Sequence, residues 1–166
     1  MEEKIYTEAI ARLKSDDAIA YYTAKEVDAP KTYEWFQDQI EQALANVSEQ
    51  NRTCPFDCPA LFFQFVPTKY EKGNTSSQEA NGTLIIHLAQ FTFVDGREGA
   101  LSHDDFKKLL RYADIIIDLL TGAKLPCSAR LVLDQIDRDH TNRPIMTDKI
   151  SLSWSGQRRR EIVPAV

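Results

Sequence analysis

The chain has 166 residues, of which 43% are hydrophobic and 27% are charged, and its formal net charge is −5. This length can bury a core without disulfides, and the composition excludes a disordered chain or a collagen-like repeat. The negative charge disfavours a general nucleic-acid-binding protein, which usually presents a basic surface. We therefore expect a single globular domain over residues 1–166, with no specific nucleic-acid binding.

The first residues, MEEKIYTEAIARLK, lack the apolar segment that a signal peptide needs. No window approaches the ~18 continuous apolar residues of a membrane span. We expect a protein kept in a reducing cytosol, with no membrane association. Its three cysteines, Cys54, Cys58 and Cys127, then need not pair, and their role is left open.

Residues 1–58 are expected to form a helical N-terminal region. The first helix is predicted from the helical spacing of Tyr6, Ala9, Ile10 and Leu13, and it should end near Ser15. Residues 18–27 give no clear pattern, and we expect at most a short strand at residues 19–22. A second helix is predicted from Asp28 as N-cap and Pro30 in the first turn. Its buried stripe would comprise Tyr33, Phe36, Ile40, Ala43, Leu44 and Val47.

Residues 59–157 are expected to form the core of the domain. A strand is predicted at residues 60–66, between two prolines, and another at residues 83–94. A long polar loop, residues 67–82, would separate them. The second strand is apolar on both sides, so either both of its faces are covered or a bulge near Ala89 and Gln90 exchanges them.

The strongest periodicity in the chain predicts a helix after residue 101. Ser102 and Asp105 resemble a capping box, and Gly122 is the expected stop. Its apolar face comprises Phe106, Leu109, Leu110, Ala113, Ile116, Ile117 and Leu120. Two closing strands are predicted at residues 130–136 and 149–155, followed by a flexible tail at residues 158–166. This order predicts an α+β fold, with a largely antiparallel sheet of about four strands and two or three helices packed on it.

Two groups of residues could in principle bind a metal. Cys54 and Cys58 have a C-x3-C spacing that Cys127, His87, His103 or His140 could complete as a zinc site, but packed cysteines and histidines are commoner. Asp134, Asp137, Asp139 and His140 could bind a divalent cation, but solvated aspartates are common where a strand enters a turn. We expect no catalytic residue, cofactor or metal, and hence a structural or interaction role rather than an enzyme.

The pattern of elements resembles the tail-terminator, or tail-completion, family of long-tailed bacteriophages and prophages. The resemblance is carried by CPALFFQFV, the polar loop, TLIIHLAQFTF, DDFKKLLRYADIIIDLL, LVLDQIDRDH and TDKISLSWSG. It covers residues 59–157, and the chain differs by its longer region before Pro59. The family has no invariant catalytic motif.

The resemblance implies a subunit of a hexameric ring that caps the phage tail tube and takes part in head–tail joining. Its partners would be further copies of itself and the tube and neck proteins. The protein would reside in the bacterial cytoplasm before assembly and in the virion tail afterwards. The alternatives are another phage or mobile-element interaction domain, such as a head–tail connector, or a metal-dependent nuclease that uses Asp137, Asp139 and His140.

In the resembling family a mobile loop projects from the sheet toward the lumen or the tube. The loop that would correspond to it here suggests a partner contact through Lys69, Tyr70, Glu71, Lys72, Asn74, Gln78 and Glu79. A second, basic contact is suggested at Arg158, Arg159 and Arg160. We expect residues 69–80 to be poorly ordered in the isolated protein and dispensable for folding.

Overall fold

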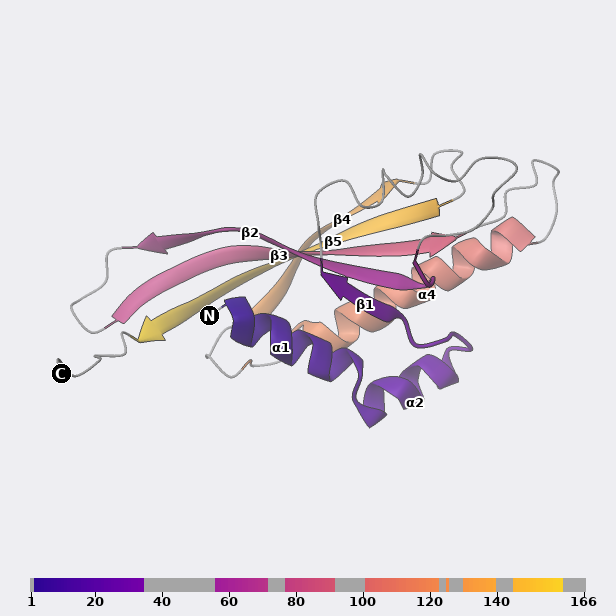
Figure 1. Cartoon of the computed structure of the whole chain (residues 1–166), viewed down its shortest axis with the longest axis horizontal. Helices are drawn as coiled ribbons and strands as arrows, with labels where there is room; N and C mark the ends of the chain where they lie inside the picture. Colours follow the sequence, from indigo (N-terminus) through magenta and orange to yellow (C-terminus); the bar gives the residue numbers. More distant parts are fainter. Residues whose placement is uncertain are drawn as a thin grey trace.

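The computed structural model describes residues 2–34, 56–71, 77–91, 101–122, 125, 130–139 and 145–159. These residues form three helices and a five-stranded sheet (Figure 1). The elements are α1 (Glu2–Leu13), α2 (Asp16–Ala24), β1 (Lys31–Glu34), β2 (Ala60–Glu71), β3 (Ser77–Phe91), α4 (Leu101–Leu120), β4 (Arg130–Asp139) and β5 (Ile145–Arg159). The predicted α+β class is confirmed, with five strands in the described residues where about four were expected.

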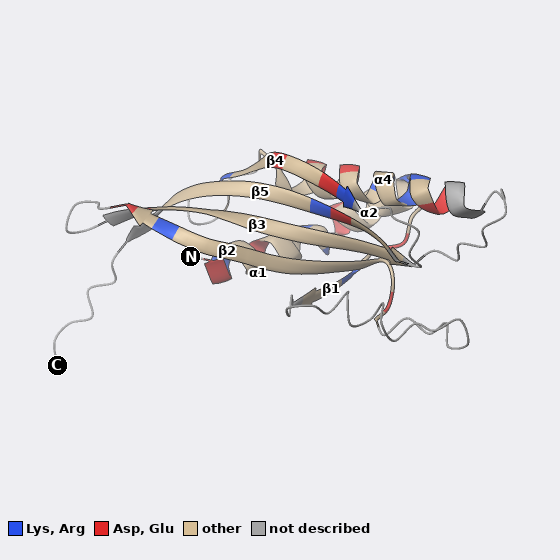
Figure 2. Ribbon diagram, turned by 90° about the horizontal axis from the view of Figure 1, so that it is seen from above, with Lys and Arg blue, Asp and Glu red and all other residues tan. Residues whose placement is uncertain are grey.

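The sheet has the strand order β1-β2-β3-β5-β4. β1 and β2 are parallel and the other three pairs are antiparallel, so the predicted, largely antiparallel sheet is confirmed. The helices α1, α2 and α4 all lie on one face (Figure 1). We call the opposite side the open face, because no described helix covers it (Figure 2).

β1 occupies residues that were predicted to begin a helix, and that prediction is wrong. Asp28 and Pro30 suit a helix start, but Lys31–Glu34 pairs with β2 from Ala60 to Phe63. The ring of Tyr33 stacks on that of Phe62, with centroids 5.3 Å apart. Packing of this kind commonly overrides a local helix signal. The rest of the predicted helix lies outside the described residues.

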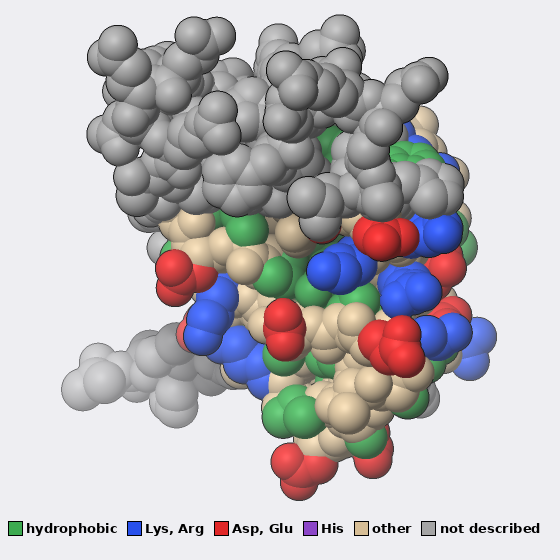
Figure 3. Space-filling view, turned by 90° about the vertical axis from the view of Figure 1, so that its right-hand side faces the viewer, with side chains coloured by type: hydrophobic (Ala, Val, Ile, Leu, Met, Phe, Trp, Pro, Cys, Tyr) green, Lys and Arg blue, Asp and Glu red, His purple; other side chains and the backbone are tan. Residues whose placement is uncertain are grey.

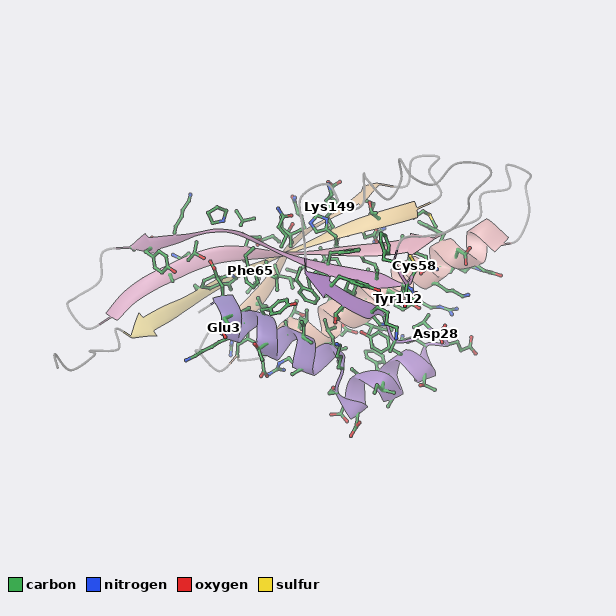
Figure 4. The ribbon with its side chains drawn as sticks, viewed as in Figure 1. Glu3, Asp28, Cys58, Phe65, Tyr112 and Lys149 are labelled. Atoms are coloured by element: carbon green, nitrogen blue, oxygen red, sulfur yellow. The ribbon has the colours of Figure 1, made fainter. Side chains whose placement is uncertain are left out.

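α1 confirms the first predicted helix, whereas α2 replaces the short strand expected at residues 19–22. Ala18 and Tyr22 are buried one helical turn apart, and nine residues are too few for that pattern to stand out in the sequence. Tyr22 packs beside Tyr112 of α4, with ring centroids 6.4 Å apart. Burial, and then the carboxylate of Asp28, raise the pKa of Tyr112 to about 12 (Figure 4). The packing of Tyr22 against Tyr112 holds α2 against α4.

We expect Ser15→Ala to lower the free energy of unfolding by about 1 kcal/mol. Ser15 is the N-cap of α2, and its Oγ accepts a hydrogen bond from the backbone N–H of Ala18 at 3.2 Å. Urea denaturation measures the loss. Thr23→Ala, near the exposed end of the same helix, is the control and should change stability by less than ~0.5 kcal/mol. Equal effects of the two variants would contradict the capping role.

α4 confirms the helix with the strongest periodicity. It begins at Leu101, so Ser102 lies inside the helix rather than at the predicted N-cap. Leu109, Ala113 and Ile116 of the predicted face are fully buried. Gly122 follows the helix with a φ of +73°, a conformation that glycine adopts readily, and its N–H donates to Leu131 of β4.

The core lies between the helices and one face of the sheet. On β3 it includes Leu84, Ile86 and Leu88, all fully buried. The register between β3 and β5 is continuous through Ala89 and Gln90, so there is no bulge in that pairing. His87 and Ala89, on the open face, are buried as well. Of the two alternatives for β3, burial of both faces is therefore the one observed, at the end of the strand that contains His87 and Ala89.

The long polar loop predicted at residues 67–82 is instead mostly a β-hairpin. β2 continues to Glu71 and β3 begins at Ser77, so only residues 72–76 of that segment lie outside the described residues. A register shift between Val66 and Lys69 accommodates Pro67, which has no N–H to donate to the ladder. Polar side chains did not prevent pairing, because the ladder is formed by backbone groups.

The C-terminal tail was also predicted to start too early. β5 runs to Arg159, with Arg158 paired to Gln78 and Arg159 to Ser77 of β3. Residues 158 and 159 therefore belong to the sheet. Residues 160–166 lie outside the described residues.

Candidate partner-contact surface

Three strands extend past the helices and form a projecting arm (Figure 1). We define the arm as residues 69–71 of β2, 77–81 of β3 and 155–159 of β5, which pair with one another. At its base, the hydroxyl of Thr68 donates a hydrogen bond to the carboxylate of Glu2 in α1. Ala80 is fully buried in the hydrophobic core, whereas the side chains of residues 69–71 are exposed. The strand that β2 contributes to the arm therefore lies outside the packed core.

The arm brings together the two sets of contact residues that were chosen separately from the sequence. Lys69, Tyr70 and Glu71 lie on β2, directly opposite Asn81, Ala80 and Glu79 of β3. Gln78 of β3 pairs with Arg158 of β5. Lys72, Asn74 and Arg160 lie outside the described residues. The expectation of poor order is wrong for residues 69–71 and 77–80, and Ala80 is fully buried, so a deletion of residues 69–80 would remove paired strand.

Side chains on the arm present both apolar and charged groups. Tyr70 is 47% exposed, while Lys69, Glu71 and Glu79 are exposed charges. Tyrosine next to mixed charge is common in protein–protein contacts, because the ring offers area and the phenol a hydrogen bond. The composition of the arm therefore suits contact with a protein.

The middle of the open face carries a buried histidine. His87 is 4% exposed, and its Nε2 lies 2.8 Å from the amide oxygen of Gln64 on β2. Burial, and then the positive charge of Lys149, lower its pKa from 6.5 to about 4. Figure 4 shows Lys149 on the side of the sheet away from the helices. His87 is thus a packed, neutral histidine, which is the commoner alternative to a metal ligand.

The candidate metal ligands do not gather in the part of the chain that the structure describes. There, no three His, Cys, Asp or Glu side chains lie close enough to hold an ion. Cys58 is half-buried, and Asp137 is paired in register with Lys149 on the open face. Cys54, Cys127 and His140 lie outside the described residues, and of His103 only the backbone position in α4 is described.

The end of the molecule that carries α2 and the start of α4 shows interleaved charges (Figure 3). Lys and Arg side chains alternate there with Asp and Glu rather than forming one basic surface. None of the described helices combines the length and apolar character that crossing a membrane requires.

Comparison with known proteins does not identify a family. The chain matches no model of a known protein family, and no curated protein matches it.

Proposed function

We propose that this chain is a structural subunit of a phage or prophage tail, which caps the tail tube and joins it to the head as part of a ring. The observation that supports this best is the arm, which unites both sets of candidate contact residues on three paired strands. The resemblance of residues 59–157 to the tail-terminator family supplies the specific role. The proposed assembly is a hexamer, formed from subunits made in the bacterial cytoplasm.

The exposed apolar side chains support an assembling subunit. Among the described residues the large exposed ones are Ile19, Val66, Tyr70, Val132 and Leu133, and four of these five lie on the sheet. A ring subunit buries such surfaces against its neighbours. The net charge of −5 suits a conduit through which DNA passes without binding.

The test is assembly with the tail tube protein of the same genome, followed by electron microscopy and sedimentation. We expect a ring of this chain at the end of each tube. Binding to head-side neck proteins without tube binding would favour the alternative, a head–tail connector. Failure to bind either kind of partner would contradict the proposal. Metal-dependent DNA cleavage that Asp137→Ala abolishes would favour the nuclease instead.

We expect Tyr70→Ser to weaken binding to the tube about tenfold or more, while changing the free energy of unfolding by less than ~0.5 kcal/mol. The ring of Tyr70 is a large exposed apolar group on the arm, so its loss affects contacts more than folding. Binding is measured by co-sedimentation with assembled tubes. Leu133→Ser is the control, because Leu133 is 36% exposed but lies on β4, away from the arm. Equal loss of tube binding in the two variants would contradict a role for the arm.

A further inference from the structure

Two neighbouring rows of residues form a groove on the open face, where the arm joins the rest of the sheet. The first row crosses β2, β3, β5 and β4 through Lys69, Asn81, Ser155 and Arg130, and the second through Val66, Thr83, Ser153 and Val132. These residues line a hollow of about 680 Å³. Small polar side chains make its floor on the two central strands. Each outer strand contributes one cation and one valine to its rims.

The rims of the groove carry cations and valines, so they favour a partner that is both acidic and apolar. Val132 is 55% exposed and Val66 37%. Lys69 and Arg130 are also exposed, and neither forms an ion pair with another described residue. The rims on β2 and β4 are three strand spacings apart, or about 14 Å. An α-helix with short side chains has a diameter of about 10 Å and fits between them.

The exposed face of α2 has these properties. Asp16 and Asp17 lie at its start, followed by Ile19, which is 49% exposed, and by the small side chains Ala20 and Thr23. Asp16 precedes Ile19 by about 4.5 Å along the helix axis. In the groove the cation row precedes the valine row by about 7 Å. The order of charge and apolar surface therefore agrees between helix and groove.

The other described helices fit the groove less well. Ile19 is the one large exposed hydrophobic residue on a described helix. The outer face of α1 carries Lys4, and that of α4 carries Lys107 and Lys108, all exposed. These cations would face the cations of the groove. Charge complementarity thus selects α2.

We propose that the groove binds α2 of a second copy of this chain, with Lys69 and Arg130 facing Asp16 and Asp17 and the two valines flanking Ile19. This inference rests on the self-assembly that the proposed function requires, and it names the surfaces involved. The groove lies on the open face and α2 on the helical side, so the contact joins different surfaces of the two copies. Repeated contacts of this kind produce a ring if they close and a filament if they do not.

The experiment exchanges the charges of the two surfaces in the full chain. The groove variant is Lys69→Glu with Arg130→Glu, and the helix variant is Asp16→Lys with Asp17→Lys. Sedimentation velocity at low salt measures self-association of each variant and of their equimolar mixture. We expect each variant alone to associate about 100-fold more weakly than the wild type, because like charges then face each other. The mixture should regain association, because each groove again meets a helix of opposite charge.

Three further variants serve as controls, one of them against loss of folding. Lysines at the start of α2 oppose the helix dipole, so Ile19→Arg serves as a second helix variant that leaves the first turn unchanged. Lys108→Glu and Glu3→Lys reverse exposed charges on α4 and α1 and should leave association unchanged. Circular dichroism confirms that every variant is folded.

A monomeric wild type, or association that the groove, helix and Ile19→Arg variants leave unchanged, would overturn the inference. So would a mixture that fails to regain association. The outcomes also distinguish this inference from the proposed function. A ring on the tail tube that resists charge exchange refutes only the groove contact, whereas charge-dependent self-association without tube binding refutes only the tail role.

Discussion

A Gly82→Val variant is expected to lose about 2–3 kcal/mol of unfolding free energy, from overpacking against a buried indole. A Cβ at residue 82 would lie 2.7 Å from Cζ2 of Trp154 and 2.8 Å from its Cε2. The two residues face each other across β3 and β5, and Trp154 is only 3% exposed. The indole belongs to the hydrophobic core, so displacing it disturbs the residues packed against it. Guanidinium denaturation at constant m-value measures the loss.

Two comparisons test whether the indole of Trp154 causes the loss of stability in Gly82→Val. Thr83→Val changes the next residue, which faces the open side and is half-buried, and it should shift stability by less than ~0.5 kcal/mol. Trp154→Leu removes the obstructing ring, so adding Gly82→Val to it should cost less than adding it to the wild type. Additive effects in this double-mutant cycle would contradict the steric explanation.

The sequence predicted the elements whose side chains repeat with a clear period. The apolar stripe of α4 spans about four turns, and the alternation of Ile150, Leu152 and Trp154 with serines marks one face of β5. β1 and α2 could not be predicted in this way. β1 has only four residues, and it follows Asp28 and Pro30, which are typical of a helix start. α2 buries only two of its nine residues. Their conformations depend on partners that are distant in sequence.

The sequence predicted which residues belong to the contact surface, but not how they lie relative to one another. Lys69 and Tyr70 were selected because they lie in the segment that would correspond to a mobile loop of the resembling family, and Arg158 because it begins a run of three arginines. Their proximity follows from the extension of β2, β3 and β5 into the arm, which depends on backbone pairing rather than on a hydrophobic pattern. The groove was missed for the same reason, since each of its rows combines residues from four strands. The serines of β5 were the one signal, because they predicted a polar face there.

We expect the wild-type protein to lose roughly 3 kcal/mol of unfolding free energy, through His87 alone, as the pH falls from above 6.5 to about 4. In the folded state burial and Lys149 lower the pKa of His87 to about 4, whereas the unfolded chain has the ordinary value of 6.5. Between these values the unfolded state binds the proton and the folded state does not. Stability therefore falls with the pH in this window, at about 1.4 kcal/mol per unit of difference in pKa, and is unaffected by His87 above it.

The measurement is the free energy of unfolding of wild type and His87→Gln at pH values from 4 to 7.5. Carboxylates also titrate near pH 4, so the difference between the two proteins isolates the histidine. We expect that difference to change by roughly 3 kcal/mol across the window. Lys149→Met should reduce this change without abolishing it, because burial is the larger cause of the lowered pKa and the lysine the smaller. A difference that is flat between pH 4 and 6.5 would show that His87 accepts a proton equally well in both states, and hence that the sheet face around it is open to water.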